Sequence, residues 1–235
     1  MSTFLEVKTE VENKVGRSNS EFTSHIGTFV NDVCNDVTDE MNFWFMKRTT
    51  SYDLTSGDGG QYTLLELTKE VDEAYLQLTS SYKKLEPVTL RDALVMFEPS
   101  PTTGEPDYIV IENDRITLFP PPDASYTMRI VVWSRFEELV EDGDTNFLLT
   151  FKKKLVVAGA LSKSFAFLQE YEDSKWWGSA RDNHESFENQ MIKLRREHNS
   201  RILNGEITLV PKSDVKATNR TERHRTGSQG PSGYY

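Results

Sequence analysis

The sequence predicts an α+β fold in which N- and C-terminal helices form a bundle that carries a β-rich insertion and an extended C-terminal tail. Three observations predict it. Apolar residues recur at three- and four-residue steps near both ends of the chain. Between these ends lie short segments rich in Thr, Tyr and β-branched residues, separated by turns that contain Gly or Pro. The residues from 211 onward are polar and have no pattern that could form a core.

Residues 1–47 are expected to form the N-terminal helices of the bundle. Phe4, Val7, Val11 and Val15 form one apolar stripe, and Gly16 is a natural stop. A second stripe, from residue 22 to residue 44, predicts a longer helix after the possible N-caps at 18–20. Both stripes need a partner, and we expect the C-terminal helices to supply it.

Residues 48–143 are expected to form the β-rich insertion with one short helix. Segments 48–54 and 61–67 flank a Gly-rich loop and are predicted to pair as a hairpin. Residues 75–82 alternate and predict another strand. The sequence Thr89-Leu90-Arg91-Asp92 resembles a capping box that opens a helix to Phe97. Further strands are expected at residues 108–111, 116–119 and 128–133.

Residues 144–205 are expected to complete the bundle with two helices, at 151–171 and 176–198. The first contains Ala158 and Gly159, which allow another helix to approach closely. The second begins with acidic residues and ends with basic ones, an order that suits the helix dipole. Residues 206–235 are assigned to a short strand at 207–210 and an extended docking tail.

Charge is distributed unevenly along the chain. The net charge is −10, but residues 211–235 contain five basic and two acidic residues, a net +3, so the rest carries −13. Phosphate contacts need a cationic surface, and the acidic body therefore argues against nucleic-acid binding outside the tail. Such asymmetry is typical of a docking arm.

The chain shows no sign of secretion or membrane insertion. It has one cysteine, Cys34, so no intrachain disulfide can form, and reducing conditions at synthesis are expected. The first residues lack a basic and apolar signal-peptide pattern, and no apolar run is long enough to span a membrane.

No set of residues predicts a catalytic, cofactor-binding or metal site, and the chain is not expected to be an enzyme. Its four histidines, His25, His184, His198 and His224, do not occur at metal-ligand spacings. The loop at 56–60 lacks the lysine of a phosphate-binding loop and is better explained as a hairpin tip. The acidic pairs at 137–138 and 141–142 lack the spacing of a calcium loop and are assigned to a solvated turn.

The order of segments resembles that of the head-to-tail adaptor, or connector, proteins of tailed bacteriophages. The strand–turn–strand passage at 116–130 resembles that family's LxLxPxPDxxYT module. It is followed by Phe147-Leu148-Leu149, by the Ala- and Leu-containing helix around 156–161, and by the long helix at 176–198. The aromatic run Phe43-Trp44-Phe45 after the N-terminal helices also resembles the family, and the likeness covers roughly residues 1–205.

This resemblance implies a structural protein of the virion neck, made in the host cytoplasm. Such proteins assemble as a homo-oligomeric ring, typically a dodecamer, that binds the portal protein and contacts tail or nozzle proteins. The ring joins head to tail and continues the channel through which DNA passes without specific binding. Two alternatives stay open: another neck or tail structural protein, such as a tail completion or nozzle subunit, and a nucleic-acid-binding module that uses the basic tail.

Three groups of residues are candidates for contacts with other molecules. Adjacent helical residues point about 100° apart, so one of Trp176 and Trp177 is expected to meet a neighbouring subunit unless both fit one wide face. The acidic residues Asp32, Asp36 and Asp39 are candidates for the channel wall. The candidate portal-docking residues of the tail are Lys212, Lys216, Arg220, Arg223, Arg225, Tyr234 and Tyr235.

Overall fold

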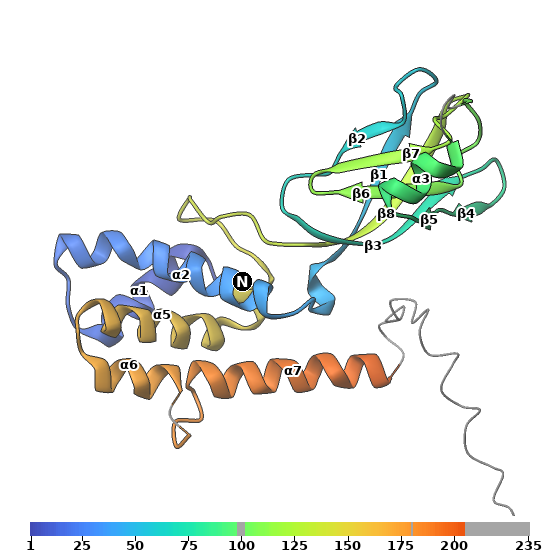
Figure 1. The fold of residues 1–235 in the computed structure, drawn as a ribbon. Coiled ribbons are helices and arrows are strands. Elements are labelled where there is room, and N and C mark those ends of the chain that lie inside the picture. Colours follow the sequence, from blue (N-terminus) through green and yellow to red (C-terminus); the bar gives the residue numbers. More distant parts are fainter. Residues whose placement is uncertain (98–101, 180, 205–235) are drawn as a thin grey trace, which may run out of the picture.

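The computed structural model describes residues 1–97, 102–179 and 181–204, and it has the predicted α+β fold. Figure 1 shows a helical bundle on one side and a separate β-rich part on the other. Two stretches of chain cross between them, one around residue 44 and one that follows residue 134. We call the second part, residues 47–134, the β module.

The bundle is formed by helices from both ends of the chain, as predicted. Its described α-helices are α1 (Phe4–Val15), α2 (Ser20–Glu40), α4 (Phe147–Phe151), α5 (Lys153–Phe167), α6 (Tyr171–Gly178) and α7 (Phe187–Leu203). Gly16 ends α1 in the left-handed conformation, with φ of 68°. Asn19 begins α2 by accepting a hydrogen bond from the backbone N–H of Phe22 at 2.8 Å. These local signals explain the sharp turn between the two helices.

Helix α5 is the centre of the bundle, because it packs against α1, α2, α4, α6 and α7. Every residue from Leu155 to Leu161 is buried. Gly159 allows α2 and α7 to pack closely on α5. A Cβ at this position would lie 2.7 Å from a methyl group of Val33 on α2 and 3.0 Å from the Phe187 ring. The small residues of this helix therefore serve the close packing that the sequence predicted.

The β module contains two four-stranded sheets. The first has the order β1-β8-β3-β4, and the second has the order β2-β7-β6-β5. The strands are β1 (Lys47–Leu54), β2 (Gln61–Thr63), β3 (Thr68–Gln77), β4 (Tyr82–Lys84), β5 (Glu86–Pro87), β6 (Tyr108–Glu112), β7 (Arg115–Phe119) and β8 (Tyr126–Ser134). The short helix α3 (Leu90–Phe97) also belongs to this module.

The two sheets pack face to face over one small core, as in a β-sandwich. That core joins Met128 and Ile130 of the first sheet to Ile116 and Leu118 of the second. Successive residues of a strand point to opposite faces, so Val110 lies on the other side of the second sheet. There it packs with Ala93 of α3 in a separate cluster.

Three aromatic residues connect the bundle to the β module. Phe43 is fully buried, and the 3-10 helix η1 (Trp44–Met46) leads directly into β1. The Phe45 ring stacks on the Phe147 ring of α4, with centroids 4.5 Å apart. This aromatic run, which the sequence analysis singled out, fixes the point where the chain leaves the bundle.

The returning strap, residues 135–146, is held against the bundle by polar contacts. The Asn31 side chain of α2 donates to the carbonyl of Leu139 at 2.9 Å and accepts from its N–H at 3.1 Å. The Asp144 carboxylate accepts hydrogen bonds from two backbone N–H groups of the strap, which lowers the pKa of Asp144. The strap is therefore an ordered turn rather than a loose linker.

The predicted hairpin of residues 48–54 and 61–67 is wrong. Strand β1 pairs along its whole length with β8, whereas β2 pairs with β7 in the other sheet. Gly60 lies at the crossing, where a Cβ would come within 2.9 Å of the Leu118 carbonyl oxygen. The intervening loop therefore carries the chain from one sheet to the other.

Further boundaries also differ from the predictions, and the helix expected at 151–171 runs only from Lys153 to Phe167. The expected strand at 75–82 ends at Gln77, and Tyr82 begins the next strand. Helix α2 ends at Glu40, because Met41 is extended. The predicted helix at 176–198 is two helices, α6 and α7, joined by a turn in which Ser186 caps α7.

The predicted strand at 207–210 and the whole basic tail lie outside the described residues. Within the part of the chain that the structure describes, no helix combines the length and apolarity needed to cross a membrane.

Candidate protein-interaction surfaces

The described residues contain no cluster of three or more His, Cys, Asp or Glu side chains that could hold a metal ion. Cys34 is buried, and burial raises the pKa of its thiol to about 11, so it stays protonated and unreactive near neutral pH. The loop at 56–60 joins two strands rather than a strand and a helix. Surfaces that contact other chains are therefore the sites to consider.

The two adjacent tryptophans of α6 lie in different environments. Trp177 is partly buried against the bundle core, and the Lys14 ammonium of α1 lies 5.3 Å from its ring centroid. Trp176 is 49% exposed. Its carbonyl accepts a hydrogen bond from the Asn183 side chain at 2.9 Å, which holds the turn after α6 close to the helix. Trp176 is therefore an exposed aromatic residue whose backbone is anchored to the following turn.

A second exposed aromatic patch lies on the bundle between α2 and α5. It consists of His25, Phe29 and Phe167, and Phe167 is 40% exposed. The Phe167 ring centroid lies 5.0 Å from that of His25 and 5.7 Å from that of Phe29. The sequence analysis considered His25 only as a possible metal ligand and missed this patch, because His25 and Phe167 are far apart in the chain.

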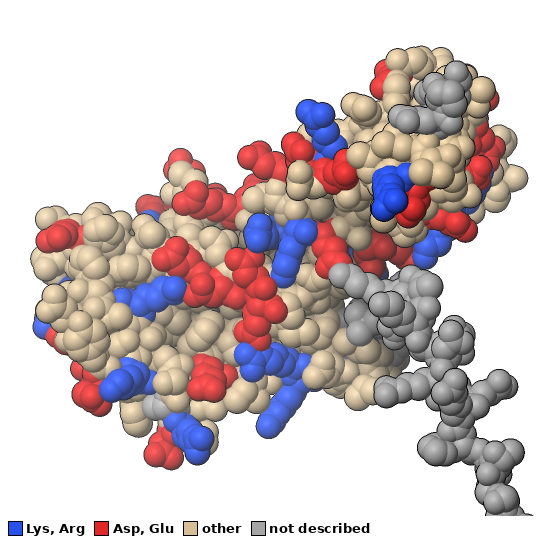
Figure 2. All heavy atoms as spheres, in the orientation of Figure 1, with Lys and Arg blue, Asp and Glu red and all other residues tan. Residues whose placement is uncertain are grey.

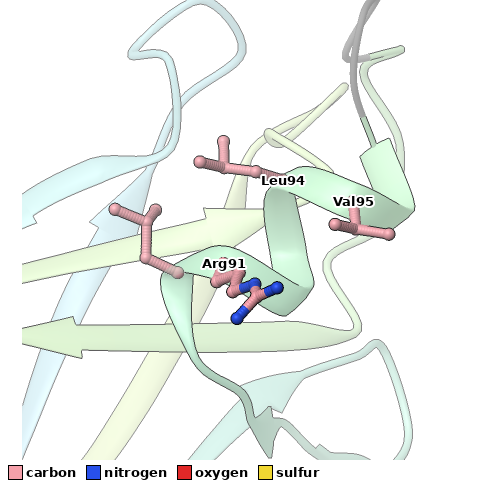
Figure 3. A pocket seen from close by; sticks show the side chains of 4 residues that line it. Arg91, Leu94 and Val95 are labelled. Atoms are coloured by element: carbon pink, nitrogen blue, oxygen red, sulfur yellow. The ribbon is translucent and has the colours of Figure 1, made fainter.

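The short helix α3 gives the β module an exposed apolar surface. Only Ala93 of this helix is fully buried, whereas Val95 is 79% exposed and Met96 is 48% exposed. Leu90, Arg91, Leu94 and Val95 line a shallow depression of about 480 Å³. Figure 3 shows Arg91, Leu94 and Val95 projecting away from the helix. This surface is large enough to accept apolar side chains from another protein.

The sequence of α3 itself indicates an exposed apolar surface, although the sequence analysis predicted only a capped helix here. Residues 93–97 read Ala-Leu-Val-Met-Phe, so apolar side chains occupy every face of the helix. An ordinary surface helix has one apolar face and one polar face. A short helix that is apolar on all sides and packs on a single sheet must expose part of its apolar surface.

The three acidic candidates for the channel wall lie along α2, but two of them have basic partners within the chain. The Asp36 carboxylate lies 2.9 Å from the Lys163 ammonium of α5. The Asp39 carboxylate accepts a hydrogen bond from the Arg135 guanidinium at 2.8 Å. Asp32 is half-buried. The charge of this face is therefore partly neutralised within the subunit.

Charges of both signs are interspersed over the bundle. Figure 2 shows acidic and basic side chains side by side on the face in view. Several of them form ion pairs, such as Lys153 of α5 with Glu10 of α1 at 2.8 Å, and Lys154 of α5 with Glu185 in the turn before α7 at 2.9 Å. The pKa of Glu185 is lowered by its hydrogen bond to Lys154. This mixed surface differs from the continuous basic surface that phosphate binding requires.

The basic residues proposed for portal docking, Lys212 to Arg225, and the terminal tyrosines lie outside the described residues. The structure does place the point from which they extend. The Arg201 guanidinium near the end of α7 lies 4.7 Å from the ring centroid of Trp44. The described chain therefore ends beside the junction of the bundle and the β module.

These features define a class of protein: a folded scaffold that exposes apolar and aromatic side chains on both of its parts for contact with other chains. A family model described as SU10 adaptor protein matches residues 2–206, which include the bundle and the β module. The chain belongs to this family and is a phage structural adaptor protein. Such a family favours a structural role over catalysis. No curated protein matches the sequence.

Proposed function

We propose that identical copies of this protein form a closed ring beneath the portal, join the head to the tail and continue the DNA channel. The ring is a dodecamer in this proposal, and it lies in the neck of the virion. The family match carries the proposal, because it spans the bundle and the β module together. The two exposed parts then have separate uses, with the bundle building the ring and the β module offering contacts to neighbours or tail proteins.

Ring closure needs head-to-tail contacts in which each subunit buries one patch against a different patch of the next. Trp176 is our candidate for the centre of one such patch, because aromatic residues are enriched in interfaces and this one is exposed. Trp177 packs within its own subunit. The two tryptophans thus divide the roles that the sequence analysis considered.

A matched pair of variants tests this contact. Trp176→Ser should reduce ring formation while leaving the unfolding midpoint of the subunit nearly unchanged, because the side chain adds little to the core. Val95→Ser, which removes an exposed apolar side chain from the β module, is the control and should leave the ring intact. Mass photometry of the two variants measures the ring directly. Equal ring formation by both variants would remove Trp176 from the interface.

The channel function follows from charge. DNA must slide through the ring, and an acidic wall repels phosphates within about a Debye length. The body of the chain carries −13, and Asp32 is the wall candidate for which no basic partner is described. We expect the protein to leave duplex DNA unshifted in a gel at physiological salt. A salt-sensitive shift that is lost without residues 212–235 would instead favour the nucleic-acid-binding alternative.

The proposed role of the tail is to bind the portal. The five basic residues between 212 and 225 and the two terminal tyrosines give it charge and aromatic contacts. The described chain ends beside the junction of the two parts. A segment without a core of its own gains contacts on binding in exchange for conformational entropy.

Electron microscopy of the protein mixed with its portal tests the ring and the tail together. The full chain should give a ring stacked on the portal, and the chain lacking residues 212–235 should fold but fail to bind in a pull-down. Unchanged binding by the shortened chain would refute the docking role. A ring found at another position in the particle would favour a tail completion or nozzle subunit.

A further inference from the structure

Each sheet of the β module has two edges, and three of the four edges are short. Strands β2 and β4 have three residues each, and β5 has two residues, one of which is Pro87. Short edges and proline are common ways to prevent one sheet from pairing with another. Strand β1 is the exception, since it has eight residues and contains no proline.

Strand β1 is also regular. Its eight residues pair without a bulge with β8, from Lys47 opposite Trp133 to Leu54 opposite Tyr126. In the sheet order it has β8 on one side and, among the described residues, no strand on the other. Arg48, Thr49, Ser51 and Asp53 are exposed. A strand in this position presents a row of backbone N–H and C=O groups that another strand can use.

The chain itself contains a segment suited to this edge. Residues 206–210 read Glu-Ile-Thr-Leu-Val, in which three of five residues are β-branched and none is Gly or Pro. The described chain ends just after α7, whose last residue is Leu203. The contact of Arg201 with Trp44, three residues before β1, puts the end of α7 at the Lys47 end of β1.

The direction of pairing decides which copy of β1 this segment reaches. All described pairs in the sheet of β1 are antiparallel, which is the more stable arrangement. To run antiparallel to β1 of its own copy, the segment would first travel along the strand and then turn back. Residues 204–206 span at most roughly 11 Å, whereas a four-residue ladder alone occupies about 14 Å. The connection is too short for both movements.

From these observations we infer that residues 206–210 of one copy add an antiparallel strand to the open β1 edge of the neighbouring copy. This inference rests on the proposed ring. Each subunit donates one strand and accepts one, which is the head-to-tail relation that closes a ring. The strand contact lies before residue 212, so the basic residues beyond it stay available for the portal.

A cysteine pair in the full chain tests the inference. Ser51→Cys in β1 and Thr208→Cys in the donated segment are combined, and rings assembled on the portal are oxidised and separated on a denaturing gel. We expect a ladder of covalently linked copies. Each single-cysteine variant is a control and should give no ladder, because Cys34 is buried. A second control combines Thr208→Cys with Lys83→Cys on the short β4 edge, and it should also give no ladder.

The outcomes separate the two proposals. Rings without a ladder, or linkage only within single copies, would overturn the strand exchange and leave the adaptor function in place. An unaltered chain that forms no ring with the portal would overturn both.

Hydrogen exchange gives a second measurement without cysteines. The amides of residues 48–53 should become protected when rings assemble, and Thr208→Pro should abolish that protection because proline cannot donate to the ladder. Ser213→Pro, beyond the segment, should retain the protection. Equal protection in both variants would overturn the inference.

Discussion

The bundle and the β module are built from the chain in opposite ways. The bundle joins α1 and α2 to helices that begin about a hundred residues later, and its core is one large cluster that runs from Phe4 to Leu194. The β module is a continuous stretch, 47–134, with one core between its sheets and a separate small cluster under α3. The bundle can form only when the segments before and after the insertion come together. The β module is formed entirely by residues of the insertion.

This difference in construction predicts different effects of mutations in the two parts. Because α5 packs against five other helices, a change in the bundle core affects several helices at once. The β module instead exposes the α3 surface and a long strand edge. We therefore expect the bundle to act as the scaffold and the β module to tolerate surface changes. Four predictions test this division, from the largest expected effect to the smallest.

The largest effect is expected from a cavity in the bundle. Phe22 on α2 is fully buried. Phe22→Ala should lower the free energy of unfolding by about 3–5 kcal/mol, because it removes a large buried ring and leaves a void. Urea unfolding followed by circular dichroism at 222 nm measures the loss. Leu5→Ala on α1, where the side chain is 48% exposed, should change it by less than about 0.5 kcal/mol. Similar losses for both would mean that this core is not the source of stability.

A cavity in the β module should act locally. Leu118 is fully buried between the sheets. Leu118→Ala should destabilise the β module by about 2–5 kcal/mol. If the two parts are separate units, the amides of β7 and β8 will exchange faster while those of α5 keep their rates. Hydrogen exchange with mass spectrometry reads both parts in one experiment. Faster exchange in α5 as well would show that the two parts unfold as one and would break the comparison.

The sequence predicted the bundle better than the β module, and the reason is physical. Helical periodicity and caps are local, so Gly16 and the possible N-caps at 18–20 marked the boundary between α1 and α2 correctly, with Asn19 as the actual cap. Strand pairing is not local. The loop at 56–60 looked like a hairpin tip, yet β1 pairs with β8, more than seventy residues away. Its residues could not reveal that the flanking strands enter different sheets.

The candidate surfaces were predictable to different degrees. Adjacent tryptophans on a helix must diverge, and the structure does place Trp176 and Trp177 in different environments. The aromatic patch around Phe167 could not be predicted, because it joins residues from α2 and α5 that only the tertiary fold brings together. The split between α6 and α7 was missed because the acidic residues Asp182 and Glu185 were assigned to the first half of one long helix, although Gly178 and Ser186 are typical stop and cap residues.

A close contact in the bundle provides a smaller test. A Cβ on Gly159 would come within 2.7 Å of Val33, whose branched side chain cannot easily turn away. Gly159→Ala should therefore cost about 1–3 kcal/mol, despite the higher helix propensity of alanine. Gly143 in the strap has no atom within 4 Å of such a Cβ, so Gly143→Ala should be neutral or slightly stabilising. Thermal unfolding distinguishes them, and a stabilised Gly159→Ala would contradict close packing of α2 on α5.

The smallest effect concerns the junction between the two parts, where His198 of α7 is buried. Its ring stacks on Trp44 with centroids 6.0 Å apart and meets Phe43 edge-on at 5.6 Å. No hydrogen-bond partner is described for its Nδ1. Burial lowers the pKa of His198 below its ordinary value, because the charged imidazolium would lose its hydration.

The sign of the pH dependence follows from that shift. Below the ordinary histidine pKa the unfolded chain binds a proton that the folded chain resists, so stability falls as the pH falls from neutral into the acidic range. Other charges near this face of α7 include Arg201 over the Trp44 ring and the ion pair of Lys152 with Glu197. His198→Leu should flatten the dependence of the urea midpoint between pH 7 and pH 5, whereas His25→Gln at an exposed site should retain it. If the two variants show the same slope, protonation of His198 does not affect stability. The contact of α7 with Phe43 and Trp44 is then held by packing alone.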